Sequence, residues 1–257
     1  MSIFVTALNS GSNGNCYYLG NGEEAVFIDA GLSCRETEKR MQRLGLDIRS
    51  VKAVFVSHEH ADHVRGLRVL SKKFNLPVYI TGETLGRVRL NPEDPRIVQM
   101  ESGEEVHIGN LIIKSFLKLH DAVHPHSFVV SCGDLRVGVF TDIGNPCQEV
   151  IRHLKQCDAA FLETNYDEEM LQNGTYPYYL KRRIQGDSGH LSNRQALELV
   201  LNHGSGRLRH LFLSHISRDN NRPELIESLF RQHLPEHNIV LTSRDREIPV
   251  FEIRREA

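Results

Sequence analysis

The stretch that decides the fold is Val54-Phe55-Val56-Ser57-His58-Glu59-His60-Ala61-Asp62-His63, in which an apolar run ends at a cluster of metal ligands. The apolar run predicts a buried strand, and the polar residues after it predict a loop at the end of that strand. The loop holds four candidate ligands, His58, His60, Asp62 and His63. Imidazole and carboxylate groups suit zinc, manganese or iron, and ligands that alternate along an extended segment can face two centres. The segment therefore predicts two adjacent metal ions.

The composition limits the kind of protein. A chain of 257 residues can bury one large core, so we expect a single domain over residues 1–257. Its 31 Lys and Arg stand against 33 Asp and Glu, for a net charge of −2, so any basic site for nucleic acid must be local. The five cysteines form no C-x-x-C pair, which argues against a disulfide framework or a thiolate metal cage and favours a reducing compartment.

The hydropathy pattern gives no sign of a membrane. The first residues, Met1-Ser2-Ile3-Phe4-Val5-Thr6, lack the basic start and the apolar length of a signal peptide, and no later run approaches membrane-spanning length. We expect a cytoplasmic protein without a membrane partner. The sequence does not indicate its oligomeric state.

Five short apolar runs end at residues that can carry chemistry. Asp29, His58, Asp142, Glu163 and His215 follow the runs 25–28, 54–56, 137–140, 159–162 and 211–213. Such runs are typical of strands covered on both faces. Helices are expected at 35–44, 64–74, 146–156, 193–202 and 223–232. With a hairpin-like stretch at 106–139, this order predicts an α/β protein with two sheets between helices. Because sites form beyond the carboxyl ends of such strands, one shared site is expected.

The pattern His-x-His-x-Asp-His at residues 58–63 resembles the signature of the metallo-β-lactamase superfamily, and His120, Asp142 and His215 match its later ligands in order and context. The resemblance implies a four-layer αββα sandwich. It also implies that His58, His60 and His120 hold one metal, that Asp62, His63 and His215 hold the other, and that Asp142 bridges them. Asp29 would orient a metal-bound imidazole. The expected cofactors are two divalent ions, Zn or Mn. The other histidines, with His126 the least clear, are interpreted as structural or solvent-facing.

Three segments are more distinctive than the metal ligands: Glu163-Thr164-Asn165-Tyr166-Asp167, Tyr176-Pro177-Tyr178-Tyr179-Leu180-Lys181-Arg182-Arg183-Ile184 and Gly189-His190-Leu191-Ser192-Asn193. With the opening Leu8-Asn9-Ser10-Gly11-Ser12-Asn13-Gly14-Asn15-Cys16, they resemble the WalJ (YycJ) group, related to the nucleic-acid-processing branch with ribonucleases Z and J. The resemblance implies a metal-dependent exonuclease acting on DNA from the 5′ end, linked to DNA repair. The interval from Asp142 to His215 is too short for the large nucleic-acid-clamping domain of ribonuclease J.

The same segments suggest substrate contacts. Ser192 and Gln195 form a capping box, so the N–H groups of a helix starting at Ser192-Asn193 could bind phosphate, although an ordinary capped helix explains them equally well. Lys181 and Arg182 could contact phosphates beside tyrosines that stack on bases, or form a solvated helix start. Ser12, Asn13 and Gly14 could form an anion-binding turn or only a tight hairpin.

Three functions compete. The first is a dinuclear phosphodiesterase on DNA, in which an activated water attacks phosphorus, Asp62 and Asp142 position it, and His190 assists departure of the sugar oxygen. The second is a small-molecule hydrolase acting on a cyclic phosphodiester, lactone or thioester, favoured by the near-neutral charge. The third is a metal-stabilised binding protein, which has no need for both Asp62 and Asp142.

Overall fold

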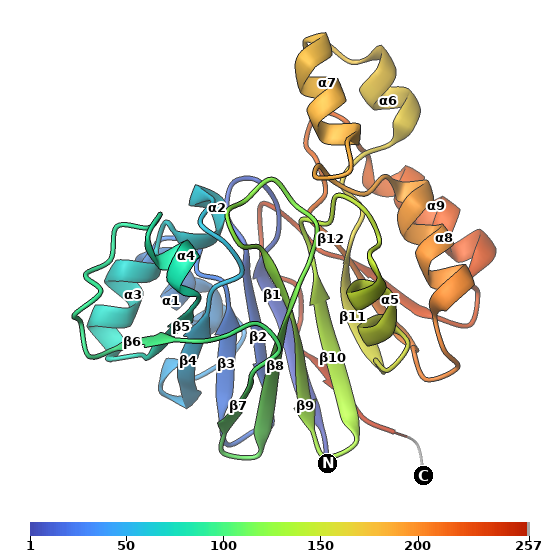
Figure 1. Ribbon diagram of the computed structural model, residues 1–257. Helices are drawn as coiled ribbons and strands as arrows, with labels where there is room; N and C mark the ends of the chain where they lie inside the picture. Colours follow the sequence, from blue (N-terminus) through green and yellow to red (C-terminus); the bar gives the residue numbers. More distant parts are fainter. Residues whose placement is uncertain (256–257) are drawn as a thin grey trace.

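The computed structural model describes residues 1–255, which form two mixed sheets stacked face to face (Figure 1). The first sheet has the strand order β14 (Phe251–Ile253), β1 (Ile3–Asn9), β2 (Cys16–Gly20), β3 (Ala25–Ile28), β4 (Val51–Phe55), β5 (Val78–Ile80) and β6 (Ile97–Gln99). The second has the order β13 (Asn238–Leu241), β12 (His210–Ser214), β11 (Ala159–Glu163), β10 (Leu135–Phe140), β9 (His126–Cys132), β8 (Leu111–Leu117) and β7 (Glu105–Ile108).

Helices cover the outer face of each sheet. The first sheet carries α1 (Cys34–Arg43) and α3 (Leu67–Phe74), and the second carries α5 (Gln148–Leu154), α8 (Asn193–His203) and α9 (Pro223–His233). The shorter helices are η1 (Ile48–Ser50), α2 (Ala61–Val64), α4 (Gly82–Leu85), α6 (Glu168–Asn173) and α7 (Tyr178–Gln185). Together these layers form the expected αββα sandwich. Within residues 1–255, every helix is too short or too polar to cross a bilayer.

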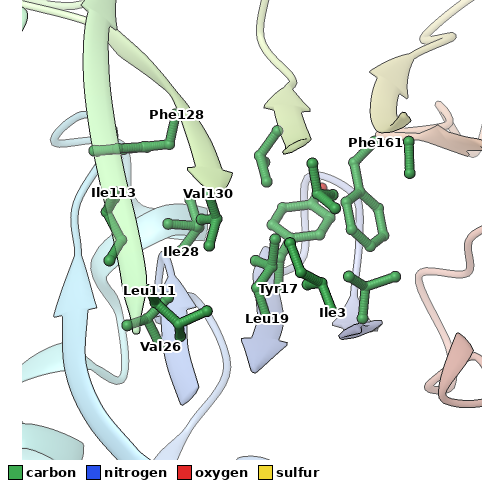
Figure 2. Close-up of a cluster of buried hydrophobic side chains, with 14 of the residues drawn as sticks. Ile3, Tyr17, Leu19, Val26, Ile28, Leu111, Ile113, Phe128, Val130 and Phe161 are labelled. Atoms are coloured by element: carbon green, nitrogen blue, oxygen red, sulfur yellow. The ribbon is translucent and has the colours of Figure 1, made fainter. Parts of the chain in front are cut away.

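The continuous apolar runs serve both faces of their sheets. In β3, Val26 and Ile28 face the opposite sheet, whereas Ala25 and Phe27 face the helices. The core between the sheets pairs these residues with side chains of β8 and β9, and Tyr17 packs against Phe161 with ring centroids 5.0 Å apart (Figure 2). Because side chains alternate along a strand, a strand covered on both faces needs an apolar residue at every position.

The five expected strands and five expected helices are present, with two corrections. Residues 61–64, whose first three were expected in a loop, form the short helix α2, and the helix expected over 64–74 begins only at Leu67, as α3, after a break at Gly66. A Cβ at Gly66 would lie 1.7 Å from the carbonyl oxygen of Leu32, and the Gly66 N–H donates to the carbonyl of Ala30. This close backbone contact interrupts the helix at Gly66. The helical periodicity of the sequence does not reveal it, because the contact is with residues more than thirty positions earlier.

The interval from Asp142 to His215 contains α5, β11, the helix pair α6–α7, α8 and β12, and no inserted clamping domain. The pair α6–α7, residues 168–185, projects beyond the upper edge of the second sheet (Figure 1). We call this projecting pair the arm. Helix α6 was not expected from the sequence, whereas a helix start around Lys181 and Arg182 was one of the two interpretations of the α7 region. The arm rises from the same edge at which β4, β10, β11 and β12 end.

Candidate metal centre

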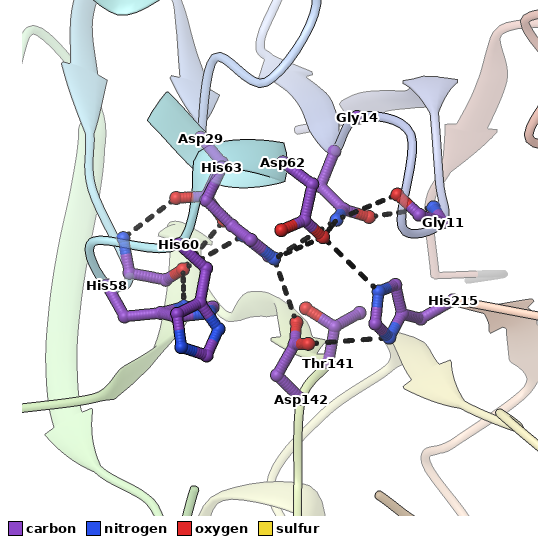
Figure 3. Close-up of polar contacts among 12 residues, drawn as sticks. Gly11, Gly14, Asp29, His58, His60, Asp62, His63, Thr141, Asp142 and His215 are labelled. Atoms are coloured by element: carbon purple, nitrogen blue, oxygen red, sulfur yellow. Dashed lines mark hydrogen bonds and ion pairs between the residues drawn. The ribbon is translucent and has the colours of Figure 1, made fainter. Parts of the chain in front are cut away.

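Three residues of the candidate centre adopt left-handed backbone conformations at the ends of strands. Asp29 (φ 62°), Asp142 (φ 54°) and His215 (φ 56°) follow β3, β10 and β12. This conformation is unfavourable for residues other than glycine, and such strain concentrates at functional sites. The sharp turns bring the three side chains together at one edge of the sandwich (Figure 3). The predicted shared site is therefore formed by strand ends from both sheets.

His58, His60 and His120 form the first predicted group of ligands. Their ligand atoms lie within 4.8 Å of one another. His58 is buried behind β4, and its Nε2 lies 3.1 Å from Nδ1 of His60. His120 comes from the loop after β8, with its ring centroid 5.0 Å from that of His58, and its Nδ1 pairs with the carbonyl oxygen of Gly189 at 3.0 Å. The three imidazoles thus converge from two sheets.

Asp62, His63 and His215 form the second predicted group, again with ligand atoms within 4.8 Å. Nε2 of His63 lies 3.4 Å from Asp62 and 3.2 Å from Oδ2 of Asp142. His215 lies between two carboxylates, with Nε2 3.7 Å from Asp62 and Nδ1 3.4 Å from Asp142 (Figure 3). Oδ1 of Asp142 also lies 3.8 Å from His120, in the first group. Asp142 therefore stands between the two groups.

Buried hydrogen bonds fix the orientation of these ligands. Asp29 accepts from Nδ1 of His63 at 2.7 Å and from the backbone and hydroxyl of Ser57 at 2.8 Å each. The hydrogen bond between Asp29 and Nδ1 of His63 is typical of a carboxylate that orients a metal-bound imidazole. Asn15 lies nearby, with Nδ2 3.1 Å from Asp62 and 3.0 Å from Nε2 of His63. Asn15 was not predicted, although it falls within the opening segment that carries the family resemblance.

Glu163 is the main residue of the centre for which no role was predicted. It is fully buried at the end of β11, and its Oε1 lies 2.9 Å from Nδ1 of His190 and 2.8 Å from Nδ1 of His215. Its Oε2 accepts backbone N–H groups of Ile143 and Leu191. The carboxylate orients both histidines, which leaves Nε2 of His190 facing away from it. The signal for Glu163 was its position at a strand end, shared with Asp29, Asp142 and His215.

The electrostatics of the centre favour cations. Burial opposes protonation of His63, but Asp142, Asp29 and Asp62 outweigh it and hold the pKa of His63 well above its usual value. Burial opposes ionisation of Asp62, yet His63 and His215 hold its pKa below the usual range. Burial, followed by the charge of His63, lowers the pKa of His58, which keeps this imidazole in the neutral form that binds metal.

The donor set fits divalent metal ions. Among the described residues, Nε2 of His120 and Nε2 of His215 are buried without a hydrogen-bond partner. Buried polar atoms normally have partners, so these two nitrogens are placed to bind a cation. Neutral imidazoles with carboxylates are the donors that zinc and manganese accept in proteins.

One buried cation lies beneath the centre. Lys118 is 4% exposed, and its Nζ donates to the carbonyl of Thr141 at 2.7 Å, one residue before Asp142. Burial lowers the pKa of Lys118, whereas the charges of Asp142 and Asp29 act in the opposite direction. Lys118 therefore supports the left-handed turn at Asp142 and offsets part of the negative charge of the carboxylates. This role of Lys118 was not predicted from the sequence.

The residues expected to contact substrate differ in their exposure to solvent. Ser192 and Asn193 are buried, and the capping box of α8 is complete, with Ser192 also donating to Glu168. Both side chains thus have partners within the fold, and their contact with a substrate stays a prediction. Ser12 is exposed, whereas the side chain of Asn13 binds the carbonyl of Arg244 and the N–H of Gly14 binds Gly11. Lys181 and Arg182 lie on the arm and reach solvent at least in part.

Residues 24–216 match the family model described as the beta-lactamase superfamily domain, so the chain belongs to this superfamily and is a metal-dependent hydrolase. It is 34% identical over 243 residues to the exodeoxyribonuclease YycJ of Bacillus anthracis, covering 92% of this chain and 90% of that protein. It is 30% identical over 263 residues to the exodeoxyribonuclease WalJ of Streptococcus pneumoniae, covering 96% of each. These matches confirm the resemblance to the WalJ (YycJ) group.

The fold is also similar to a solved structure. The metallo-β-lactamase fold protein YhfI from Bacillus subtilis superimposes with a TM-score of 0.76, over 98% of this chain and 100% of that chain, at 15% sequence identity. At this identity the similarity concerns the fold.

Proposed function

We propose that this protein is a dinuclear metal-dependent phosphodiesterase that removes nucleotides from the 5′ end of DNA. The observation that carries the proposal is the pair of converging ligand groups with Asp142 between them. Two relatives named exodeoxyribonucleases, similar over more than nine-tenths of this chain, support DNA as the substrate. The 5′ polarity and a role in DNA repair are proposed from the resemblance to their group.

His58, His60 and His120 would hold one ion, and Asp62, His63 and His215 the other, with Asp142 shared. Divalent ions at such a site lower the pKa of bound water and neutralise charge on phosphate oxygens. The contributions of the chain are to place these ligands and to move protons. The carboxylates of Asp62 and Asp142 would orient the attacking water by accepting its hydrogen bonds, toward a phosphate lying across the two groups.

His190 would donate a proton to the departing sugar oxygen. Its Nδ1 is held by Glu163 at 2.9 Å, and its ring centroid lies 5.2 Å from the rings of both His120 and His215. Its side chain is 20% exposed, so the free edge of the ring is open to a ligand at the mouth of the centre. The carboxylate of Glu163 stabilises the imidazolium that donates the proton.

A direct test incubates the purified protein with manganese or zinc and with DNA or RNA labelled at either end, beside His58→Ala protein prepared identically. The proposal predicts progressive loss of the 5′ label from DNA by the unaltered protein and little release by the variant. Equal release from both, or none from either, would contradict it. Metal analysis of the same preparations should give two ions per chain for the unaltered protein.

The near-neutral net charge of −2 favours a second candidate, a small-molecule hydrolase of the same fold. Rapid cleavage of bis-(p-nitrophenyl) phosphate by a protein that neither binds nor cuts DNA would support this alternative. Metal-loaded protein that binds DNA without turnover under any metal would instead support a binding protein.

A further inference from the structure

Helix α7 of the arm exposes aromatic side chains that a helix normally buries. None of its side chains is buried, and Tyr178 and Tyr179 are 76% and 74% exposed. Apart from Met1, they are the most exposed large hydrophobic residues in the described part of the chain. Aromatic rings contribute to stability when they are covered, so two adjacent exposed rings on a projecting helix mark a binding surface.

We propose that α7 is a docking surface for a single-stranded segment of DNA, on which Tyr178 and Tyr179 stack against unpaired bases and Arg182 contacts backbone phosphate. This inference rests on the proposed function and names the form of DNA that the enzyme takes. In a duplex the bases stack on one another and their faces are closed to side chains. A tyrosine pair therefore recognises an unpaired strand, at which aromatic stacking is tolerant of sequence.

The spacing on α7 suits a strand that alternates bases and phosphates. Residues four apart lie on the same face of a helix, about 6 Å apart along its axis. Tyr178 therefore shares a face with Arg182, and Tyr179 shares one with Arg183. Each face presents a ring followed by a guanidinium one turn later. A strand lying along the helix can place a base on the ring and a phosphate on the guanidinium.

The charge of α7 complements a polyanion. The helix carries Lys181, Arg182 and Arg183 and no acidic residue. Arg182 is exposed and makes no ion pair within residues 1–255, so its charge is available to a ligand. Helix α6 carries Glu168 and the exposed Glu169, and Glu168 is directed elsewhere, because it accepts from Ser192 and pairs with Arg194 on α8. The positive charge is therefore that of α7, with Arg182 as a cation unpaired among the described residues. Positive charge on one helix of an otherwise near-neutral protein is the local basic site that nucleic-acid binding requires.

The arm is connected to the metal centre. Nε of Arg183 lies 2.5 Å from Oδ2 of Asp121, whose Oδ1 is 3.3 Å from Nε2 of the ligand His120. The loop after α7 provides the carbonyl of Gly189 that pairs with His120. Nζ of Lys181 donates to the carbonyl of Gln172, which braces α7 against α6. A strand leaving the Arg183 end of α7 therefore arrives beside His120 and His190.

The test compares a Tyr178→Ala/Tyr179→Ala double variant with a Leu201→Ala/Leu225→Ala control, which removes two exposed apolar side chains from α8 and α9. Fluorescence anisotropy measures binding to labelled single-stranded and blunt duplex DNA, and bis-(p-nitrophenyl) phosphate hydrolysis reports on the metal centre. We expect the tyrosine variant to bind single strands at least ten-fold more weakly, with the hydrolysis rate unchanged. Tyr178→Phe/Tyr179→Phe should retain most of the affinity, because the rings remain.

Arg182→Gln should weaken single-strand binding and reduce its dependence on salt, whereas Arg35→Gln, an exposed arginine of α1, should do neither. If the tyrosine variant binds single strands within two-fold of the unaltered protein and DNA is still cut, the docking surface on α7 is refuted and the proposed function stands. A change in oligomeric state without a change in DNA binding would overturn the docking surface in favour of a contact between two copies. If the unaltered protein hydrolyses the small phosphodiester but neither binds nor cuts DNA, the proposed function is refuted. The docking surface on α7, which rests on that function, is then refuted as well.

Discussion

Oε1 of Glu163 lies 2.9 Å from Nδ1 of His190 and accepts from Nδ1 of His215 as well, so one buried carboxylate orients a proposed proton donor and a metal ligand. Its other oxygen receives two backbone N–H groups. The four groups that face Glu163 are two imidazole nitrogens and two backbone N–H groups, and each needs a hydrogen-bond acceptor. Burial opposes ionisation of Glu163, but His190 and His215 outweigh it and lower its pKa to about 2.

Glu163→Gln should therefore impair the centre without unfolding the protein. A glutamine that keeps its oxygen toward the backbone N–H groups turns its NH₂ toward two imidazole N–H groups, which are also donors. We expect metal affinity and hydrolysis to fall about 10- to 100-fold, as for other partners of metal ligands. Titration with a chromophoric chelator and steady-state kinetics would measure both. Glu149→Gln, a half-exposed carboxylate of α5 that pairs with Arg152, is the control. Wild-type values for Glu163→Gln would refute the role.

Lys118→Met should weaken metal binding by about ten-fold or more. The change removes the bond to the Thr141 carbonyl that supports the turn at Asp142, and it removes the positive charge beneath the carboxylates. Lys114→Met is a matched control, because Lys114 lies on β8, the strand that Lys118 directly follows, is half-exposed and pairs with Glu105 at the surface. Equal metal affinity in the two variants, measured by competition with a chelator, would show that Lys118 does not support the centre.

Gly31→Ala should destabilise the fold strongly. A Cβ at Gly31 would lie 1.6 Å from the carbonyl oxygen of Asp62, and it would press on the backbone of Asn15. Both neighbours are backbone atoms that hold the ligand loop, so they cannot move aside without displacing Asp62 and His63. We expect a loss of at least about 3 kcal/mol in the free energy of unfolding, measured by urea denaturation. Gly206→Ala, where nothing lies within 4 Å, should change it little.

More of the fold than of the site could be predicted from the sequence. Strands were predictable because doubly covered strands require continuous apolar runs, and the ligands were predictable because His58 to His63 lie side by side in the chain. Glu163 and Lys118 were not assigned, since a single buried charge acquires its role only from partners distant in sequence. The break at Gly66 depends on a contact with Leu32, which no local periodicity records. The exposure of Tyr178 and Tyr179 likewise follows from the tertiary position of the arm.

His153 should make stability depend on pH below neutrality. It is buried on Phe116, with ring centroids 4.1 Å apart, and burial, followed by the charge of Arg152, lowers its pKa from 6.5 to about 4. Because the folded pKa is below the unfolded one, the unfolded chain binds the proton first as the pH falls. Stability from this group is therefore complete above about pH 6.5 and is lost as the pH falls toward 4.

The measurement compares His153→Gln with the unaltered protein by denaturation in the presence of a chelator at pH 7 and pH 4.5. The stability of the variant relative to the unaltered protein should improve by on the order of 2 kcal/mol at the lower pH. His233→Gln, an exposed histidine of α9, should show no such change. The same pH dependence in His153→Gln and in the unaltered protein would show that His153 does not titrate in this range.

The most direct test of the central claim is a time course of digestion of DNA labelled at the 5′ end or at the 3′ end, by unaltered protein and by Asp142→Asn protein loaded with the same metal. Asp142 stands between the two ligand groups, so its loss should abolish two-metal hydrolysis while the remaining ligands keep the fold. The prediction is early release of the 5′ label and gradual shortening of the 3′-labelled strand by the unaltered protein, with release reduced at least 100-fold in the variant. Equal digestion by both proteins, or early release of the 3′ label, would contradict it.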